Sequence, residues 1–148
     1  MKLKTILLAE DNQNDVDLTL MALADYNVAN KIVVVNDGVD TLEYLRMQGR
    51  FADRKPGNPV VILLDLKMPR MDGLEVLREI KEDPLLKIIP VVIITSSREE
   101  QDLVESYRLG VNAYVVKPVE FRKFVDAIRQ LGAFWAVLNE IPGNIDNH

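Results

Sequence analysis

The chain has 148 residues, of which 48% are hydrophobic and 28% charged, so we expect a globular protein with a substantial core rather than a disordered chain. It contains no cysteine, and its one histidine is the last residue, which excludes disulfides and cysteine-based zinc sites and argues against a histidine-based catalytic centre. The formal net charge of -5 argues against nucleic-acid binding, and no apolar run approaches the roughly 18 residues of a membrane span.

The first half of the chain alternates segments typical of buried strands with segments typical of helices. Residues 1–4 lack the apolar region and cleavage site of a signal peptide, so we expect a cytoplasmic protein. Aliphatic runs predict strands at Thr5–Ala9 and Lys31–Val35. A helix between them is indicated by three apolar residues at helical spacing: Val16, Leu20 and Leu23. A second helix is expected at Gly38–Gln48, and the polar segment 50–59 is expected to be a loop.

The third strand and its helix come next. Val60–Leu64 is a continuous aliphatic run that ends at Asp65. Asp72, followed three residues later by Glu75, is typical of a helix N-terminus. We expect this helix to continue through Ile80.

The last two strands are predicted at Pro90–Ile94 and Ala113–Val116. Between them, Ser97 followed by Glu100 predicts a capped helix, and Gly110 predicts its end. A final helix is indicated by five apolar or aromatic residues: Phe121, Phe124, Ile128, Leu131 and Trp135.

Five strand–helix units in succession predict an α/β fold. Continuous aliphatic strands indicate a parallel sheet that is covered on both faces. Right-handed crossover connections then favour an open, doubly wound sheet of five strands. Because no repeat, linker or break in composition interrupts the pattern, we expect a single domain over residues 1–148.

Polar residues follow four of the predicted strands at their carboxyl ends, where open parallel sheets bind ligands. These residues are Glu10 and Asp11 after the first strand, Asp65 after the third, Thr95 and Ser96 after the fourth, and Lys117 after the fifth. Three carboxylates at one site repel each other, and a hard divalent cation such as Mg²⁺ relieves that repulsion. Because Mg²⁺ readily shares its ligand shell with phosphate oxygens, the set predicts a site for a phosphorylated substrate.

Phosphoryl transfer to a carboxylate suits this set of residues. An aspartate can act as a covalent nucleophile and form an aspartyl phosphate, and Asp65 is the predicted acceptor. Mg²⁺ and Lys117 would neutralise the phosphoryl oxygens, while Thr95, with Ser96 beside it, would donate a hydrogen bond. Each residue also has a purely structural interpretation, as a helix cap, a turn residue or a solvated lysine. Their common place at one sheet edge favours the functional interpretation.

Four segments together resemble the receiver domain of bacterial response regulators, in this order: Leu8–Asn12, Leu63–Gly73, Ile93–Ser97 and Ala113–Pro118. The resemblance spans residues 4 to about 131. It implies a CheY-like receiver domain with the flavodoxin-like strand order 2-1-3-4-5. It also implies a two-component system in which a sensor histidine kinase donates the phosphoryl group.

The resemblance implies a role for each residue of the site. Asp65 matches the phosphoacceptor. Asp11 and Asp65 match the metal ligands, together with the backbone carbonyl of Lys67. Glu10 would act through a metal-bound water, and Lys117 would contact the phosphoryl group.

The resemblance also implies a switch. Thr95 and Tyr114 match its paired residues, and Pro118 matches a proline that follows a cis peptide bond. In this hypothesis the Thr95 hydroxyl moves to the phosphoryl group and the Tyr114 ring turns inward, which changes the face formed by the fourth helix, fifth strand and fifth helix. The structural alternative for Tyr114 is a core aromatic.

Three further segments resemble the stand-alone regulators that pair with phytochrome kinases: the loop 50–59, the stretch 82–90 and a C-terminal helical extension from about 132 to 148. Such regulators tend to dimerise, and three residues of the extension are expected at a homodimer interface: Phe134, Trp135 and Leu138. The alternative is that they cover their own subunit. We expect no DNA-binding segment after the last helix, and the expected output is therefore contact with a downstream protein or a phosphotransfer partner.

Other functions remain open on the same fold. A Mg²⁺-dependent phosphatase would also use an aspartate nucleophile, although Lys67 stands where the commonest such family has its general acid. A module that binds partners without phosphorylation is the second alternative, and the complete set of site residues argues against it. Nucleotide or flavin binding is disfavoured because glycine-rich phosphate loops are absent. We expect a phosphoacceptor that assists its own phosphorylation and dephosphorylation rather than an enzyme.

Overall fold

The computed structural model describes residues 5–24, 31–117 and 122. The predicted last helix, the C-terminal extension, the domain boundaries and the homodimer contact lie outside this part of the chain and stay predictions. The same holds for the individual residues singled out there: Pro118, Phe134, Trp135 and Leu138. Within the described ranges, no helix is long and apolar enough to cross a membrane.

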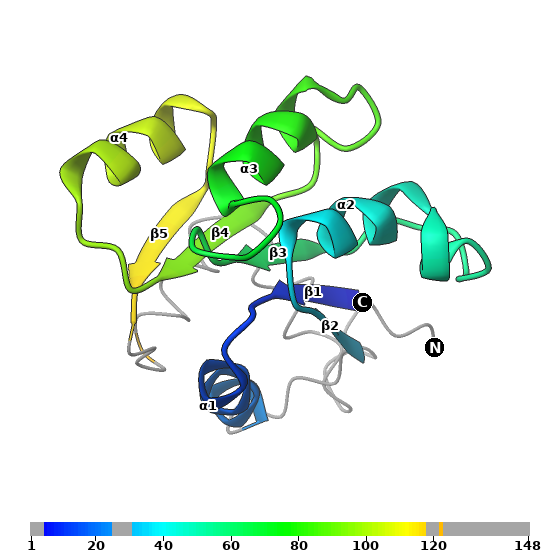
Figure 1. Cartoon of the computed structure of the whole chain (residues 1–148), viewed down its shortest axis with the longest axis horizontal. Helices are drawn as coiled ribbons and strands as arrows, with labels where there is room; N and C mark the ends of the chain where they lie inside the picture. The colour runs from blue at the N-terminus through cyan, green and yellow to red at the C-terminus, as the bar shows by residue number, and fades with distance from the viewer. Residues whose placement is uncertain (1–4, 25–30, 118–121, 123–148) are drawn as a thin grey trace, which may run out of the picture.

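The described residues form five strands that alternate with four α-helices (Figure 1). The elements are β1 (Thr5–Ala9), α1 (Gln13–Ala24), β2 (Lys31–Val35), α2 (Gly38–Arg46), a short 3-10 helix η1 (Gly49–Phe51), β3 (Val61–Leu64), α3 (Gly73–Glu82), β4 (Val91–Thr95), α4 (Glu100–Arg108) and β5 (Ala113–Val116). All five predicted strands are confirmed to within one residue at each end. The predicted loop 50–59 differs only in that η1 extends into it.

The strands form one sheet in the order β2-β1-β3-β4-β5, and every neighbouring pair is parallel. This is the doubly wound order expected from the resemblance. In the register of the central pair, Leu8 lies beside Leu63 and Ala9 beside Leu64. The carboxyl ends of β1 and β3 therefore lie at the same edge of the sheet.

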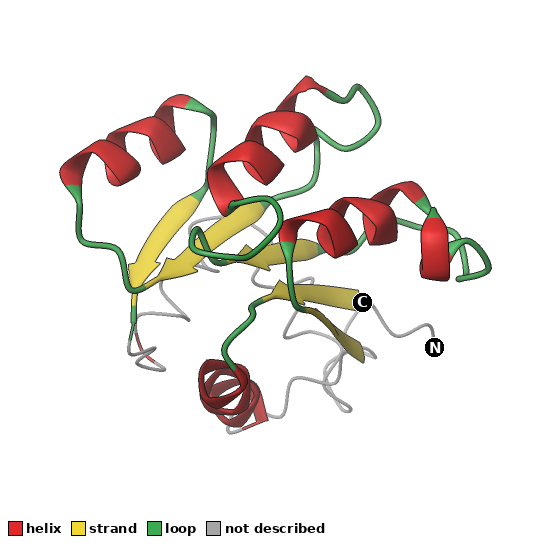
Figure 2. Cartoon of the chain, viewed as in Figure 1, coloured by secondary structure: helices red, strands yellow, loops and turns green. Residues whose placement is uncertain are grey.

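Helices cover both faces of the sheet (Figure 2). Helices α2, α3 and α4 lie on one side, and α1 lies on the other. Strand β3 contributes to both cores, because Ile62 points to the core that includes residues of α2 and α3, while Leu63 points to the core that includes residues of α1. Fully burying a side chain of this size contributes about 1.5–3 kcal/mol, so the two cores fix the sheet that carries the site.

One helix cap predicted from the sequence is confirmed by the structure, and another is not. Asp72 caps α3 as predicted, because its side chain accepts a hydrogen bond from the Glu75 backbone N–H. The prediction that Ser97 caps the next helix is wrong, because α4 begins at Glu100 with Glu99 as the cap residue. The Ser97 hydroxyl instead donates to the Asp102 carboxylate over 2.6 Å. The same hydroxyl oxygen accepts from the N–H of Glu99 over 3.4 Å, so Ser97 lies beside the helix terminus without serving as its cap residue.

Candidate functional site

The backbone of the site is an extension of the sheet. Beyond the strand ends, the Glu10 N–H donates to the Val35 carbonyl, and the Asp65 N–H donates to the Ala9 carbonyl. Just beyond β5, the Lys117 N–H donates to the Thr95 carbonyl in the same way. These bonds hold the residues after β1, β3 and β5 in line with the sheet, so their side chains are fixed at its carboxyl edge.

Three carboxylates meet at this edge. One carboxylate oxygen from each of Glu10, Asp11 and Asp65 lies within 4.8 Å of the other two. Glu10 is 2% exposed and Asp65 4%, whereas Asp11 is exposed to solvent. The cluster therefore has two buried carboxylates and one at its mouth, and the sequence-based expectation of a common position agrees with this geometry.

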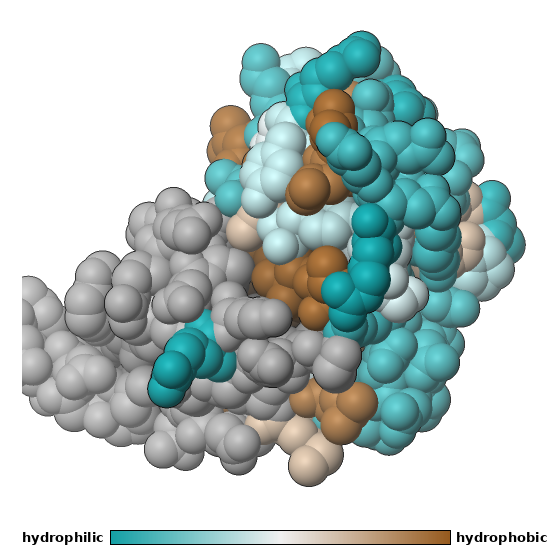
Figure 3. Space-filling view, turned by 90° about the vertical axis from the view of Figure 1, so that its left-hand side faces the viewer, coloured by the Kyte–Doolittle hydropathy of each residue, from teal (hydrophilic) through white to brown (hydrophobic). Residues whose placement is uncertain are grey.

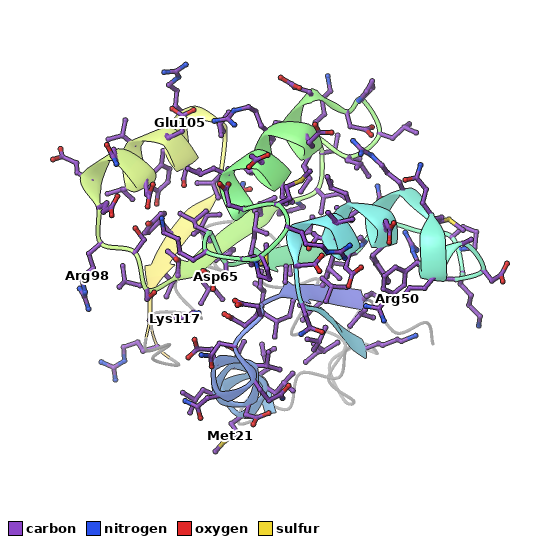
Figure 4. The ribbon with its side chains drawn as sticks, in the orientation of Figure 1. Met21, Arg50, Asp65, Arg98, Glu105 and Lys117 are labelled. Atoms are coloured by element: carbon purple, nitrogen blue, oxygen red, sulfur yellow. The ribbon has the colours of Figure 1, made fainter. Side chains whose placement is uncertain are left out.

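Lys117 lies within this cluster (Figure 4). Its ammonium nitrogen Nζ is 2.6 Å from Glu10 Oε1 and 3.0 Å from Asp65 Oδ2. A third carboxylate, Asp15, lies 2.8 Å from the same nitrogen. One ammonium group thus shares its charge among three carboxylates that come from three different elements.

The carboxylates of this cluster outnumber the single positive charge of Lys117. Burial raises the pKa of Glu10 to about 7, with the hydrogen bond from Lys117 opposing the rise and the charge of Asp65 adding to it. Burial acts to lower the pKa of Lys117, but its hydrogen bonds to Asp15, Glu10 and Asp65 together raise it above its ordinary value. The lysine therefore stays charged, while one nearby carboxylate still holds a proton near neutral pH.

The loop after β3 presents Asp65 in a fixed geometry. The Lys67 N–H donates to Asp65 Oδ1 over 3.2 Å, and the Gly73 N–H donates to the Leu66 carbonyl over 2.9 Å. A Cβ atom on Gly73 would overlap the carbonyl oxygen of Asp65, so only glycine allows α3 to begin this close to the acidic cluster.

A charged residue also ties this loop to α2. Arg70 has a positive φ of 64° and forms hydrogen bonds with both carboxylate oxygens of Asp37, at 2.8 and 3.0 Å. It also reaches Asp40 at 3.0 Å. Burial opposes the effect, but Arg70 lowers the pKa of Asp37 below its ordinary range. Since Asp37 is the cap residue of α2, this pairing joins the start of α2 to the loop that carries Lys67.

Ser97 connects the site to α4 and β5. Its N–H donates to the Thr95 hydroxyl oxygen over 3.3 Å, and its carbonyl accepts from the Tyr114 hydroxyl over 3.1 Å. Its own hydroxyl donates to Asp102, which also lies 3.7 Å from the Lys67 ammonium nitrogen. Thr95 is fully buried, and the half-buried Tyr114 ring packs against the core on the α2–α3 side. The two expected switch residues are therefore linked through one intervening residue.

The structure adds residues that the sequence did not single out. Asp15 and Asp102 make direct contacts within the site or at its margin. By contrast, the side chain of Ser96, which the sequence did single out beside Thr95, is exposed. The spacing of Asp11 and Asp15, four residues apart at the start of a predicted helix, was a signal available in the sequence. Asp102 had no comparable signal, because its partners Ser97 and Lys67 depend on the packing of α4 against the sheet.

Known proteins share both the sequence and this fold. The sequence profile described as "Response regulator receiver domain" matches residues 6–129. The response regulator Rcp1 of Synechocystis sp. is 37% identical over 139 residues, which cover 94% of this chain and 93% of Rcp1.

Solved structures agree with these matches. The bacteriophytochrome response regulator RtBRR is 57% identical with a TM-score of 0.86, over 97% of this chain and 86% of that one. The phosphorylated cyanobacterial phytochrome response regulator RcpA is 40% identical with a TM-score of 0.77, over 96% of this chain and 100% of that one. The Mn²⁺-bound form of Rcp1 has a TM-score of 0.75 at 37% identity, over 89% of this chain and 94% of that one.

Proposed function

The chain belongs to the response regulator receiver domain family, and from this we propose that Asp65 accepts a phosphoryl group from a sensor histidine kinase. One observation carries the assignment of Asp65. Its buried carboxylate follows β3, faces two further carboxylates, and lies 3.0 Å from the charged Lys117 nitrogen. An anionic nucleophile beside a fixed cation is the arrangement that phosphoryl transfer needs.

The similarity to RtBRR, RcpA and Rcp1 over most of their length supports a kinase of the phytochrome type as the donor. In the transfer, an Asp65 oxygen forms a bond to phosphorus while the phosphorus–nitrogen bond of the kinase's phosphohistidine breaks. The electron pair of that bond stays on the imidazole nitrogen. Lys117 is placed to hold negative charge on the phosphoryl oxygens, and the buried Thr95 hydroxyl is placed to donate a hydrogen bond to one of them.

The donor set fits a divalent metal ion, and we propose Mg²⁺. Oxygens of Glu10, Asp11 and Asp65 converge within 4.8 Å, and hard oxygen donors of this kind suit Mg²⁺. The pKa of Glu10, raised mainly by burial and further by the charge of Asp65, supports the same conclusion, because a nearby cation would stabilise the ionised carboxylate. Asp11 and Asp65 would bind the ion directly with the Lys67 carbonyl, and Glu10 through a water. When bound, Mg²⁺ supplies positive charge to the transferred group.

The output is proposed to be a change in protein contacts at the face formed by α4 and β5. A phosphoryl group on Asp65 would accept a hydrogen bond from the Thr95 hydroxyl and draw it away from the Ser97 N–H, which disturbs the residue that also contacts Tyr114 and Asp102. On α4, three apolar or aromatic side chains are exposed by 38–56%: Leu103, Val104 and Tyr107. Figure 3 shows apolar side chains among hydrophilic ones on the side of the molecule where α4 lies.

Phosphorylation in vitro tests the proposal. Wild-type protein is incubated with acetyl phosphate and either Mg²⁺ or EDTA, and its intact mass is followed over time. We expect an acid-stable, base-labile gain of one phosphoryl group that requires Mg²⁺ and is lost in Asp65→Asn. Asp72→Asn is the matched control, since it removes the same charge from an exposed cap residue and asparagine can still cap the helix.

Two results would contradict the proposal. Phosphorylation of Asp65→Asn at the wild-type rate would place the acceptor elsewhere. Repeated hydrolysis of an added phosphoester by the wild type, without a phosphorylated protein accumulating, would instead favour the phosphatase alternative. Self-assisted phosphorylation and dephosphorylation would appear as Mg²⁺-dependent rates in both directions.

A further inference from the structure

The ammonium group of Lys117 has all three of its N–H donors directed at carboxylates. An ammonium has three donors, and the three acceptors are Glu10, Asp15 and Asp65, at 2.6, 2.8 and 3.0 Å. The lysine side chain is only 10% exposed, so water is a minor alternative partner. Any new bond from Lys117 to a phosphoryl oxygen therefore requires that one of these three be given up.

The three carboxylates differ in what else they do. Glu10 and Asp65 also belong to the cluster that converges on the proposed metal position, whereas Asp15 does not. Asp15 is therefore the acceptor that stays with Lys117 when a metal and a phosphoryl group engage the other two. Its place in the first turn of α1 makes it a rigid anchor, because its N–H donates to the Asn12 side chain over 3.0 Å.

We propose that Asp15 is a positioning residue for phosphoryl transfer, which holds Lys117 against Asp65 while the other two carboxylates change partners. The inference rests on the proposed phosphorylation of Asp65. Without Asp15, the flexible lysine side chain would lose its one constant partner and would have to be ordered anew in each transfer. The negative charge of Asp15 is not what the transfer needs, because the acidic cluster already holds more carboxylates than Lys117 can neutralise.

A second explanation of Asp15 makes different predictions. An acidic residue in the first turn of a helix interacts favourably with the helix dipole, whatever lies opposite it. In that case Asp15→Asn would lower the stability of the fold and would act independently of Lys117. The positioning role instead requires that the effect on transfer disappear when Lys117 is absent.

The experiment compares rates of phosphorylation by acetyl phosphate at saturating Mg²⁺. We expect Asp15→Asn to react roughly five- to tenfold more slowly, the effect of losing one charge-assisted hydrogen bond at a partly buried site. Asp15→Glu should recover most of the rate. The matched control is Asp17→Asn, on the same helix with an exposed side chain that accepts a hydrogen bond from Gln13, and it should stay within about twofold of wild type.

A double-mutant cycle completes the test. In the Lys117→Gln background, Asp15→Asn should cause no further loss of rate, because the residue on which it acts is gone. An equal loss with and without Lys117, or a wild-type rate in Asp15→Asn, would overturn the inference. If the wild type takes up no phosphoryl group that depends on Asp65, the proposed function itself fails and the inference falls with it. Asp65-dependent uptake with an unaffected Asp15→Asn variant refutes the positioning role alone.

Discussion

Replacing Glu10 with glutamine should remove a pH-dependent loss of stability from the metal-free protein. Burial, opposed by Lys117 and reinforced by the charge of Asp65, raises the pKa of Glu10 from its ordinary value of 4.5 to about 7. Between these values the folded protein keeps a proton that the unfolded chain has released. The free energy of unfolding therefore falls as pH rises through this window.

The size of the effect follows from the two pKa values. One pKa unit corresponds to about 1.4 kcal/mol, so ionised Glu10 lowers the stability of the metal-free protein by about 3 kcal/mol at most. The glutamine variant does not titrate at this position. Lys117 and the Asn12 N–H face different oxygens of Glu10, and glutamine has a carbonyl oxygen at only one of these two positions, but that cost does not depend on pH.

The assay is urea unfolding of both proteins in EDTA between about pH 5 and pH 8, where the linkage applies. The variant should gain stability relative to the wild type as pH rises towards 7, the pKa of Glu10 in the folded protein being about 7, and the gain should level off above that pH. Using the difference between the two proteins cancels the titration of groups that they share. Adding Mg²⁺ should abolish the slope. If the free energy of unfolding of the variant minus that of the wild type is constant with pH, or falls as pH rises, then Glu10 does not have the raised pKa on which the prediction rests.

Three further results are expected. Gly73→Ala should destabilise the protein by about 2 kcal/mol or more and slow phosphorylation, because the new Cβ overlaps the Asp65 carbonyl; unchanged urea unfolding would contradict this. Ser97→Ala should cost about 1–3 kcal/mol, because Asp102 loses its hydroxyl donor while staying buried; unfolding within about 0.5 kcal/mol of wild type would contradict it. Mg²⁺ binding, measured by calorimetry, should tighten about tenfold between pH 6 and pH 8 as Glu10 ionises, and a pH-independent Kd would argue against Glu10 at the site.

Much of the fold could be predicted because its signals are local. The aliphatic runs of β1 and β3 are long enough to be recognised alone, and parallel strands must carry their following residues to one edge. That rule predicts that Glu10, Asp65 and Lys117 lie together, as they do in the structure. The Asp72 cap was also predictable, since the Asp72 carboxylate and the Glu75 N–H that donates to it are three residues apart on one segment.

The contacts that the sequence missed are between distant segments. Whether Asp15 reaches Lys117 depends on how α1 is rotated against the sheet, and the two residues are 102 positions apart in the chain. One exception lies within a single segment: Ser97 has the local signature of a helix cap, but its hydroxyl donates to Asp102, five residues further along the chain. Arg70 reaches Asp37 from a backbone with positive φ, a conformation that arginine rarely adopts and that its residue type does not predict.

Chemical mapping of the phosphorylated residue tests the central claim most directly. Borohydride reduces an acyl phosphate to an alcohol, so a phosphorylated aspartate becomes homoserine and can be located by peptide mass spectrometry. After treatment with acetyl phosphate and Mg²⁺, we expect homoserine at position 65 and at no other carboxylate of the cluster. Homoserine at Asp11, or an unmodified Asp65 in a protein that carries the phosphoryl group, would contradict the account.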